Sequence, residues 1–245
     1  MKHLIKFYPV ENADCTLIKL SNGMTIIVDC QLFDNLNDEE GNPIRYDVKK
    51  DLLKELGTDS NGYPYVDLFV STHPHDDHCK GFDGNFYHGN PDEYDSKKNE
   101  NEIIIGELWV TPRGIGNELA DSAETIRQEA KRRRNLYDDN TNFVGNYGNF
   151  LRIVGYNKQS TFERYGYVHG TLVTTIDGQD MAWLEMFIHA PFKEDVDKSK
   201  DEDDKNATSI VVQYRFKVKN DIGEIQTVCK LLMGGDDEHE IWQHI

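Results

Sequence analysis

The sequence predicts a mixed α and β fold in which helices pack on β-sheets. The chain opens with three short runs that alternate apolar and polar residues, a pattern typical of half-buried strands. A helical segment then separates these runs from the next strand, so an all-β protein is not expected. The loop of residues 71–81 follows that strand and places three histidines and two aspartates within six positions.

Length and composition favour one soluble domain. A chain of 245 residues is long enough for a single sizeable core, and we expect one domain over residues 1–245. Hydrophobic residues make up 38% and charged residues 29%, and no run approaches the roughly 18 apolar residues of a membrane span. The N-terminus lacks the apolar stretch of a signal peptide. We therefore expect a cytoplasmic protein that has no membrane partner.

The charge balance and the cysteines exclude some classes of function. A net charge of −17 argues against broad, non-specific binding of nucleic acid, although a nuclease can use metal ions as its local positive charge. The four cysteines include no C-x-x-C pair, so neither a disulfide framework nor a zinc ribbon is expected. Cys15, Cys30 and Cys229 are predicted to be small core residues, whereas Cys79 lies beside the histidine His78.

The first third of the chain predicts three strands, one helix and then the strand that precedes the histidine loop. Asn22-Gly23 is a tight hairpin signal, because both residues tolerate positive φ. Asp47 is expected to cap a helix that runs to about Leu56, with Gly57 as its C-terminal stop. The predicted strands here are residues 3–10, 16–20, 24–29 and 66–70.

The remaining chain predicts a surface insertion, a long helix and two hairpins. Residues 82–102 are polar and irregular, and we expect them at the surface. The helix of residues 118–137 carries a basic cluster at 131–134, which is either a solvated helix end or a phosphate-contacting patch. Strands are expected at 107–110, 149–156, 171–176, 181–188, 206–218 and 225–233, the last four as two hairpins.

Metal-type ligands follow three separate strands. A loop has no packing use for several imidazoles, whereas neutral imidazole and carboxylate are the ligands that zinc prefers. If the strand ends converge at one sheet edge, these side chains form a two-metal pocket there; the alternative is a solvated histidine loop. The candidate ligands are His73, His75, Asp77 and His78 after one strand, His189 after another and Asp236 after a third.

The pattern His-x-His-x-Asp-His at residues 73–78 resembles the metal signature of the metallo-β-lactamase superfamily. Four further segments, in order, resemble motifs of that superfamily, most closely those of the branch associated with bacterial DNA-uptake channels and its stand-alone relatives. They are Ile27-Val28-Asp29, residues 187–191 (FIHAP), residues 206–209 (NATS) and residues 231–236 (LLMGGD). The resemblance covers most of the chain. It implies an α+β fold, the αββα sandwich, in which two mixed sheets lie face to face, helices cover the outer faces and the metal site lies at one edge.

The resemblance also implies a ligand set. His73, His75 and His189 would surround a first zinc, while a second would take the two ligands Asp77 and His78. Asp236 would bridge the two ions, with Asp237 as the competing assignment.

Other residues would support the site from outside it. The resemblance implies that Asp29 orients ligands. Asn206 and Ser209 either form a substrate-side network or are ordinary strand residues. Asp76 is expected to cap the loop or to lie outside the ligand set, and His3, His88 and His169 are not expected to be ligands.

Such a site implies a hydrolase that activates water. One or two Zn2+ ions, or Mn2+ or Fe2+ in their place, lower the pKa of a bound water and polarise a phosphoryl or carbonyl oxygen. Asp77 and Asp236 would position that water as well as bind metal. The branch resemblance favours phosphodiesters, as in a nuclease or a nucleotide phosphodiesterase. The alternatives are a hydrolase of a small thioester, ester or lactam, and a degenerate metal-binding interaction module of a defence or regulatory system.

The sequence departs from the branch at its C-terminal end. Relatives continue to a His-His-Gly motif that supplies another ligand to the second metal, and this chain ends at Ile245 without it. His239 and His244 are expected at the surface. The domain is therefore expected to lack its C-terminal portion, to have an incomplete second site, or to be completed by a partner chain or in a homo-oligomer.

Overall fold

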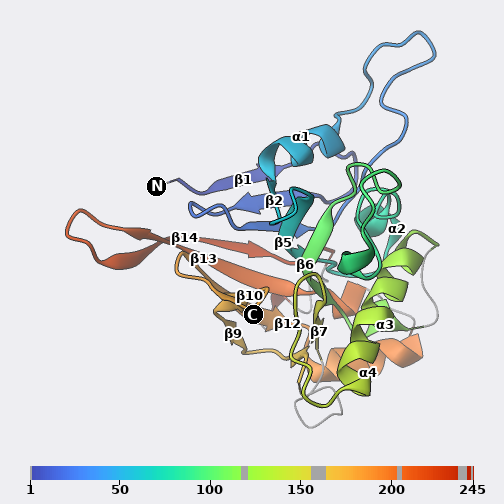
Figure 1. The fold of residues 1–245 in the computed structure, drawn as a ribbon. Helices are drawn as coiled ribbons and strands as arrows, with labels where there is room; N and C mark the ends of the chain where they lie inside the picture. Colours follow the sequence, from blue (N-terminus) through green and yellow to red (C-terminus); the bar gives the residue numbers. More distant parts are fainter. Residues whose placement is uncertain (1, 117–120, 156–163, 203–205, 237–241, 244) are drawn as a thin grey trace.

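The computed structural model describes residues 2–116, 121–155, 164–202, 206–236, 242–243 and 245. Within these residues the chain forms a mixed α and β fold with two larger sheets and a two-stranded ribbon (Figure 1). The helices are α1 (Val48–Glu55), α2 (Asp76–Cys79), α3 (Glu124–Asp139) and α4 (Lys193–Glu202). Short 3-10 turns lie at Pro91–Glu93, Arg113–Ile115, Asp121–Ala123 and Asn206–Thr208.

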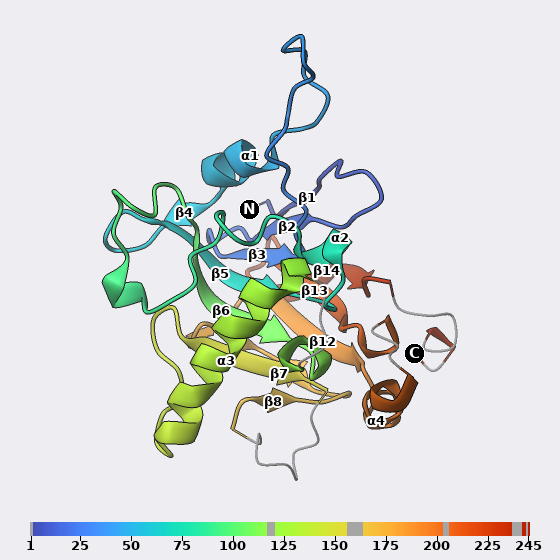
Figure 2. The ribbon, with the colours of Figure 1, turned by 90° about the vertical axis from the view of Figure 1, so that its right-hand side faces the viewer.

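The first sheet is mixed and has the order β1-β2-β3-β5-β6-β7-β8, with β4 paired to β5. The strands β1, β2 and β3 are antiparallel, whereas β3, β5, β6, β7 and β8 run parallel to one another. Its strands are β1 (Leu4–Phe7), β2 (Thr16–Lys19), β3 (Thr25–Val28), β4 (Gly57–Thr58), β5 (Pro64–Val70), β6 (Ile104–Val110), β7 (Phe150–Val154) and β8 (Gly166–Tyr167). In Figure 2 this sheet descends from β1 to β8, and α3 crosses in front of it.

The second sheet is antiparallel and has the order β14-β13-β12-β9. The expectation that both sheets are mixed is therefore wrong for this one. A short turn joins β13 to β14, whereas the connection from β12 to β13 contains α4, and that long connection still brings the chain back antiparallel. The strands are β9 (Leu172–Val173), β12 (Leu184–Ala190), β13 (Val211–Lys219) and β14 (Ile225–Met233), while β10 (Thr175–Ile176) and β11 (Gln179–Asp180) form the ribbon.

Alternate side chains of the first sheet enter two hydrophobic clusters. Leu17 packs in a cluster that contains residues of α1 and α3, whereas its neighbour Ile18 packs in one that contains residues of β12 and β13. The same alternation separates Leu108 from Trp109 on β6. Since successive strand residues face opposite sides, one face of the first sheet is covered by helices and the other shares a buried core with the second sheet.

Several predicted elements differ in their ends. Asp47 caps α1 by accepting a hydrogen bond from the Lys50 backbone at 2.9 Å, as expected, but the helix ends at Leu56 in an extended conformation. Gly57 is not the helix stop, because it begins β4 and pairs with Tyr65.

Two other predicted elements are confirmed only in part. Residues 171–176 and 181–188 pair antiparallel as predicted, through β9 and β12, but the pair is interrupted and its tip, residues 175–180, forms the separate ribbon of β10 and β11. Residues 206–208 form a 3-10 turn instead of the start of a strand, so β13 begins at Val211. In the helix predicted at 118–137, the described α3 begins at Glu124, and residues 117–120 lie outside the described part.

The segment 82–102 is not purely a surface insertion. The side chains of Phe82 and Phe86 are fully buried in the cluster beneath α1 and α3. The backbone N–H of Gly89 donates to the Glu129 carboxylate of α3 at 3.0 Å. The polar composition of this segment therefore did not indicate that Phe82 and Phe86 are core residues, which hold the segment against the first sheet.

The basic cluster at 131–134 is divided among different tasks. Arg133 is buried, Arg132 pairs with Glu129 at 2.7 Å, and Arg134 lies 3.8 Å from Asp138. Neither a solvated helix end nor a phosphate patch describes this arrangement. A helix turns by about 100° per residue, so four consecutive side chains cannot share one face.

The cysteines and the length of the helices can also be compared with the sequence. Cys229 is exposed on β14 instead of buried, whereas Cys15, Cys30 and Cys79 are buried. In the part of the chain that the structure describes, no helix is both long and apolar enough to cross a membrane.

Candidate metal centre

The ends of two parallel strands bring Asp29 beside the histidine loop. Asp29 follows β3 and the loop follows β5, and these neighbouring strands run in the same direction. The backbone N–H of Asp29 donates to the Val70 carbonyl at 2.9 Å, which continues the ladder past the strand ends. The loop then turns into the single helical turn of α2, so His78 lies one turn after His75.

The second sheet reaches the same place. The backbone N–H of Ile210, just before β13, donates to the Thr72 carbonyl at 3.0 Å. After β14 the chain passes so close to the loop that a Cβ at Gly235 would lie 2.6 Å from the Thr72 hydroxyl oxygen. Gly235 also has a φ of +53°, which glycine adopts without strain. The glycine thereby allows Asp236 to approach the histidines.

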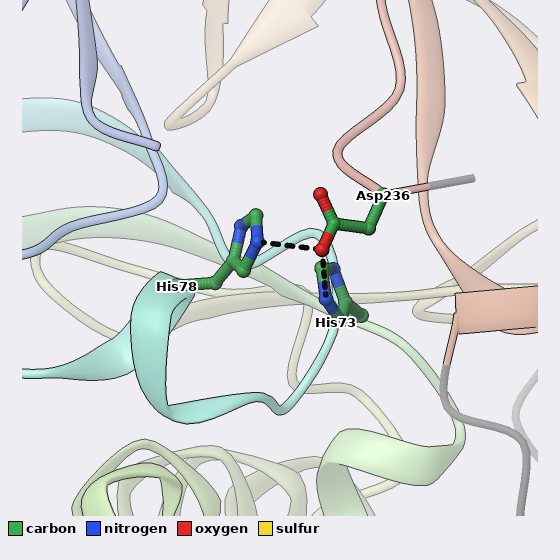
Figure 3. A group of neighbouring side chains, drawn as sticks. All are labelled: His73, His78 and Asp236. Carbon is green, nitrogen blue, oxygen red and sulfur yellow. Dashed lines mark ion pairs between the residues drawn. The ribbon is translucent and has the colours of Figure 1, made fainter. Parts of the chain in front are cut away.

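Three side chains meet at this point (Figure 3). His73, His78 and Asp236 each offer one ligand atom within 4.8 Å of the others. Nε2 of His78 lies 3.5 Å from Oδ2 of Asp236, and Nε2 of His73 lies 4.0 Å from the same oxygen. Both imidazoles are buried, while the Asp236 side chain is 47% exposed. The group is therefore open to solvent on the side of the carboxylate.

Asp29 fixes the orientation of both rings. Its buried carboxylate accepts from the Thr72 backbone N–H at 2.7 Å, from the Thr72 hydroxyl at 2.6 Å and from Nδ1 of His78 at 2.9 Å. Since the Thr72 proton is donated to Asp29, the hydroxyl oxygen accepts from Nδ1 of His73 at 3.1 Å. Both rings then carry their proton on Nδ1, and both Nε2 atoms are directed at Asp236 as potential ligands.

The charges around His78 are strongly negative. Burial alone would lower the pKa of His78, but the hydrogen bond and charge of Asp29, with the charges of Asp236 and Asp77, raise the pKa to about 9. The carboxylates thus favour a positive charge at this imidazole. A divalent ion at Nε2 would satisfy the same field and would displace the proton.

Asp77 and His75 lie beside this group without belonging to it, and His189 is not among its ligand atoms either. Oδ2 of Asp77 is 3.9 Å from Nε2 of His78, and the His75 ring centroid is 4.8 Å from that of His73. His189 ends β12, and its Nε2 is buried without a hydrogen-bond partner among the described residues. Burial and the charges of Arg215 and His169 lower the pKa of His189, which keeps this ring neutral and able to bind a metal.

The predicted supporting residues have mixed positions. Ser209 is buried, and no described residue hydrogen-bonds to its hydroxyl. Its backbone N–H donates to the Asn206 carbonyl at 2.9 Å, which places both residues in the turn before β13, next to Thr72. Asp76 is exposed and accepts from the Ser122 hydroxyl, which agrees with a role outside the ligand set.

Among the described residues, neither Cys79 nor any other histidine joins the group of His73, His78 and Asp236. His88 is a surface residue that pairs with Asp83, and His3 contacts the Lys217 carbonyl at 2.8 Å. Burial raises the pKa of Cys79 far above its usual range, so its thiol stays protonated. The residues Asp237, His239 and His244 lie outside the described part of the chain.

A cavity opens at the start of α4. It has a volume of about 310 Å³ and is lined by the first residues of α4 and by residues that follow β7, β8 and β12, among them His169, Pro191 and Phe192. This volume is at the lower end of the range for small-molecule sites.

Two residues at the centre, Thr72 and Asp14, were not predicted from the sequence. Thr72 links Asp29 to His73, and Asp14 joins Asp29 and His78 in a second group whose ligand atoms lie within 4.8 Å of one another. Asp14 lies in the polar turn between β1 and β2, where an aspartate is ordinary.

No protein-family model matches this sequence, and neither does any of the curated proteins with which it was compared. A function can therefore be argued only from the residues themselves and from the way in which they are arranged.

Proposed function

We propose that this protein is a metal-dependent hydrolase of the metallo-β-lactamase type, with zinc as its metal and phosphodiesters as its substrates. The observation that carries this proposal is the convergence of two Nε2 atoms, from His73 and His78, on Oδ2 of Asp236. Imidazole nitrogen and carboxylate oxygen from three separate segments are a donor set that zinc, manganese and iron accept. The proposal extends the fold to an αββα sandwich in a single domain, in the cytoplasm.

The donor set fits a divalent ion. Asp29 and Thr72 hold the protons of both rings on Nδ1, so each Nε2 is available as a ligand. His189 supplies a half-buried, neutral ring near the end of β12, and its Nε2 atom is buried. His73, His75 and His189 would hold one ion, and Asp77 and His78 a second, with Asp236 between them. A bound ion would supply a water that ionises near neutral pH and would offset charge that develops on a phosphoryl or carbonyl oxygen.

The residues of this chain would then act as holders and orienters. Asp236, half exposed, faces both the histidines and solvent, so it can orient an attacking water by accepting its proton in a hydrogen bond. Asp77, whose Oδ2 lies 3.9 Å from Nε2 of His78, can do the same.

The substrate class rests on the branch resemblance and on charge. A protein with a net charge of −17 attracts a phosphodiester only where a cation offsets its own field, so binding would depend on the metal. The same site can hydrolyse a thioester, ester or lactam, and this is the alternative within enzymes. The other class is a metal-binding interaction module, in which a partner chain or second copy completes the second metal position.

Substrate hydrolysis by metal-loaded protein tests the proposal. Protein prepared with Zn2+, Mn2+ or Fe2+ is given bis-nitrophenyl phosphate, nitrocefin and a thioester. We expect metal-dependent cleavage of the phosphodiester and at least a 100-fold loss of rate in Asp236→Asn, because this change removes a charged ligand (about 100-fold or more for a transition-state contact). His88→Ala, a change at a surface histidine, should retain the wild-type rate.

Three other results would redirect or end the proposal. Cleavage of nitrocefin or the thioester alone would favour the alternative substrates. Metal binding without any hydrolysis would favour the interaction module. A protein that contains no metal after metal-replete expression, and whose stability is unchanged by His73→Ala and His75→Ala, would contradict the metal centre itself.

A further inference from the structure

We propose that Asp14, in the turn between β1 and β2, is a ligand of the metal ion beside His78 and supplies a donor that the histidine motif lacks. This inference rests on the proposed function, because it assigns one more residue to the same centre. It concerns the second ion, whose ligands from the motif are Asp77, His78 and the shared Asp236.

The position of Asp14 is the first argument. One ligand atom each of Asp14, Asp29 and His78 lie within 4.8 Å of one another. The ligand atoms of His73, His78 and Asp236 also lie within 4.8 Å of one another, and His78 belongs to both groups. The two groups therefore meet at one imidazole, which receives carboxylates from the β1–β2 turn and from the end of β14.

The capacity of each carboxylate is the second argument. Asp29 is fully buried and already accepts three hydrogen bonds, from the Thr72 backbone and hydroxyl and from His78. Those bonds fix its place beside the rings and use three of its roughly four lone-pair sites. Asp14 is exposed, and the strongest influences on its carboxylate are partial burial and nearby charges instead of hydrogen bonds. Asp14 is thus the member of this group that can turn toward an ion.

The backbone around Asp14 is held in place. The next residue, Cys15, is buried, and its carbonyl accepts from the Tyr8 backbone N–H at 3.0 Å across the turn. Val10 is buried on the other side, and its carbonyl accepts from the Gln31 side chain at 3.2 Å. A turn anchored at both ends costs less to order around an ion than a free loop does.

The local charge is the third argument. The charges that act most strongly on Asp14 are those of His78 and of the carboxylates of Asp29, Asp236 and Asp77. Four carboxylates surround one imidazole, and a positive charge on His78 offsets only one of their four negative charges. A second divalent ion would offset more of this negative charge, and oxygen donors suit zinc, manganese and iron.

Calorimetric titration with Zn2+ and, separately, Mn2+ tests the assignment. The metal-free full chain is compared with Asp14→Asn and with Glu11→Gln, a matched control that removes one exposed carboxylate from the same turn. We expect two binding steps in the wild type. In Asp14→Asn the second step should weaken at least tenfold while the first keeps its affinity, and Glu11→Gln should show both wild-type steps.

The outcomes separate this inference from the proposed function. Two unchanged binding steps in Asp14→Asn would overturn the role of Asp14. A wild type that binds a single ion would overturn it too. Neither result would contradict the hydrolase proposal. A wild type that binds no ion at all would overturn both. Circular dichroism of each variant checks the fold, which a change at an exposed side chain should preserve.

Discussion

Asp29 shows how much one buried carboxylate can organise. It is fully buried and accepts from Thr72 twice and from His78 once. Through the Thr72 hydroxyl it also sets which nitrogen of His73 carries the proton. A buried carboxylate is costly unless its oxygens are bonded, so this network holds one arrangement of the rings.

A second carboxylate, the half-buried Asp177, lies away from the histidines, beside Tyr65 at the start of β5. It occupies the turn between β10 and β11, accepts from the Tyr65 hydroxyl at 2.6 Å, and its backbone N–H donates to Glu107 at 2.8 Å. Burial raises the pKa of Asp177 to about 7, and the charges of Asp67 and Glu107 add to this effect, while the Tyr65 hydrogen bond opposes it.

The raised pKa of Asp177 predicts a pH dependence of stability. An unfolded aspartate has a pKa near 3.9, so between about pH 4 and 7 the folded state holds a proton that the unfolded state has lost. Stability from this group is present below pH 4 and is lost as the pH rises through 7. We expect the free energy of unfolding of the wild type to fall by about 1–2 kcal/mol more than that of Asp177→Asn between pH 4 and 8, after allowance for solvent screening.

Urea unfolding at several pH values measures this difference. Asparagine keeps an acceptor for Tyr65 and tolerates the positive φ of 52° at this position. A constant offset between the two proteins at all pH values, which means parallel pH profiles, would reflect local packing alone and would show that Asp177 does not titrate as described.

At the scale of elements, α3 buries a charged face. Arg133 and Glu129 are each 1% exposed and are joined at 2.7 Å. The Arg133 guanidinium also donates to the carbonyls of Ile105, Gly106 and Phe150, at 2.9, 3.1 and 2.8 Å. The arginine thus ties the helix to β6 and to the start of β7 through groups that would otherwise lack partners.

Removing this arginine should destabilise the fold strongly. In Arg133→Met the carbonyls lose their donor and Glu129 loses one of its partners, and we expect a loss of about 3 kcal/mol in the free energy of unfolding. Arg134→Met is the matched control on the same helix, because its pair with Asp138 is partly exposed, and it should cost less than about 1 kcal/mol. Denaturant titrations compare the two, and equal losses would contradict the structural role of Arg133.

At the scale of the whole molecule, the centre lies where the two sheets meet. The first sheet contributes the loop after β5, and the second contributes Asp236 after β14. A backbone hydrogen bond from Ile210 to Thr72 joins them at this end. A metal ion held by both would therefore cross-link the two halves of the fold.

This cross-link predicts that metal stabilises the folded chain. At a free Zn2+ concentration of about 100 times the dissociation constant, binding should add about 2.7 kcal/mol. For a chain of this length that corresponds to a rise of roughly 5–10 °C in the thermal midpoint. A chelator should reverse the rise, and His78→Ala should abolish most of it, whereas His88→Ala should keep it. Equal midpoints with and without metal would argue against a shared site.

The local patterns of the sequence were sufficient for much of the fold. The cap at Asp47, the strand before the histidines and the long helix that contains Arg133 follow from short-range rules, since capping, alternation and helix composition act over a few residues. The predicted hairpin over 171–188 is confirmed in the antiparallel pairing of β9 with β12, but its local pattern did not indicate that the tip forms a separate ribbon or that β12 also pairs with β13.

The sequence by itself determined the type of chemistry that this protein can carry, because three histidines and two aspartates in one loop are specific in their residue types. Only the tertiary structure decided which of them meet. It directs His73 and His78 at Asp236, sets their protonation through Asp29 and Thr72, and adds Asp14 from a turn that is about 60 residues away along the chain. Asp29 and the histidines meet because the parallel strands β3 and β5 end at the same edge of a sheet, whereas Asp236 comes from the second sheet and Asp14 from the β1–β2 turn. Spacing along the chain carries no record of these contacts.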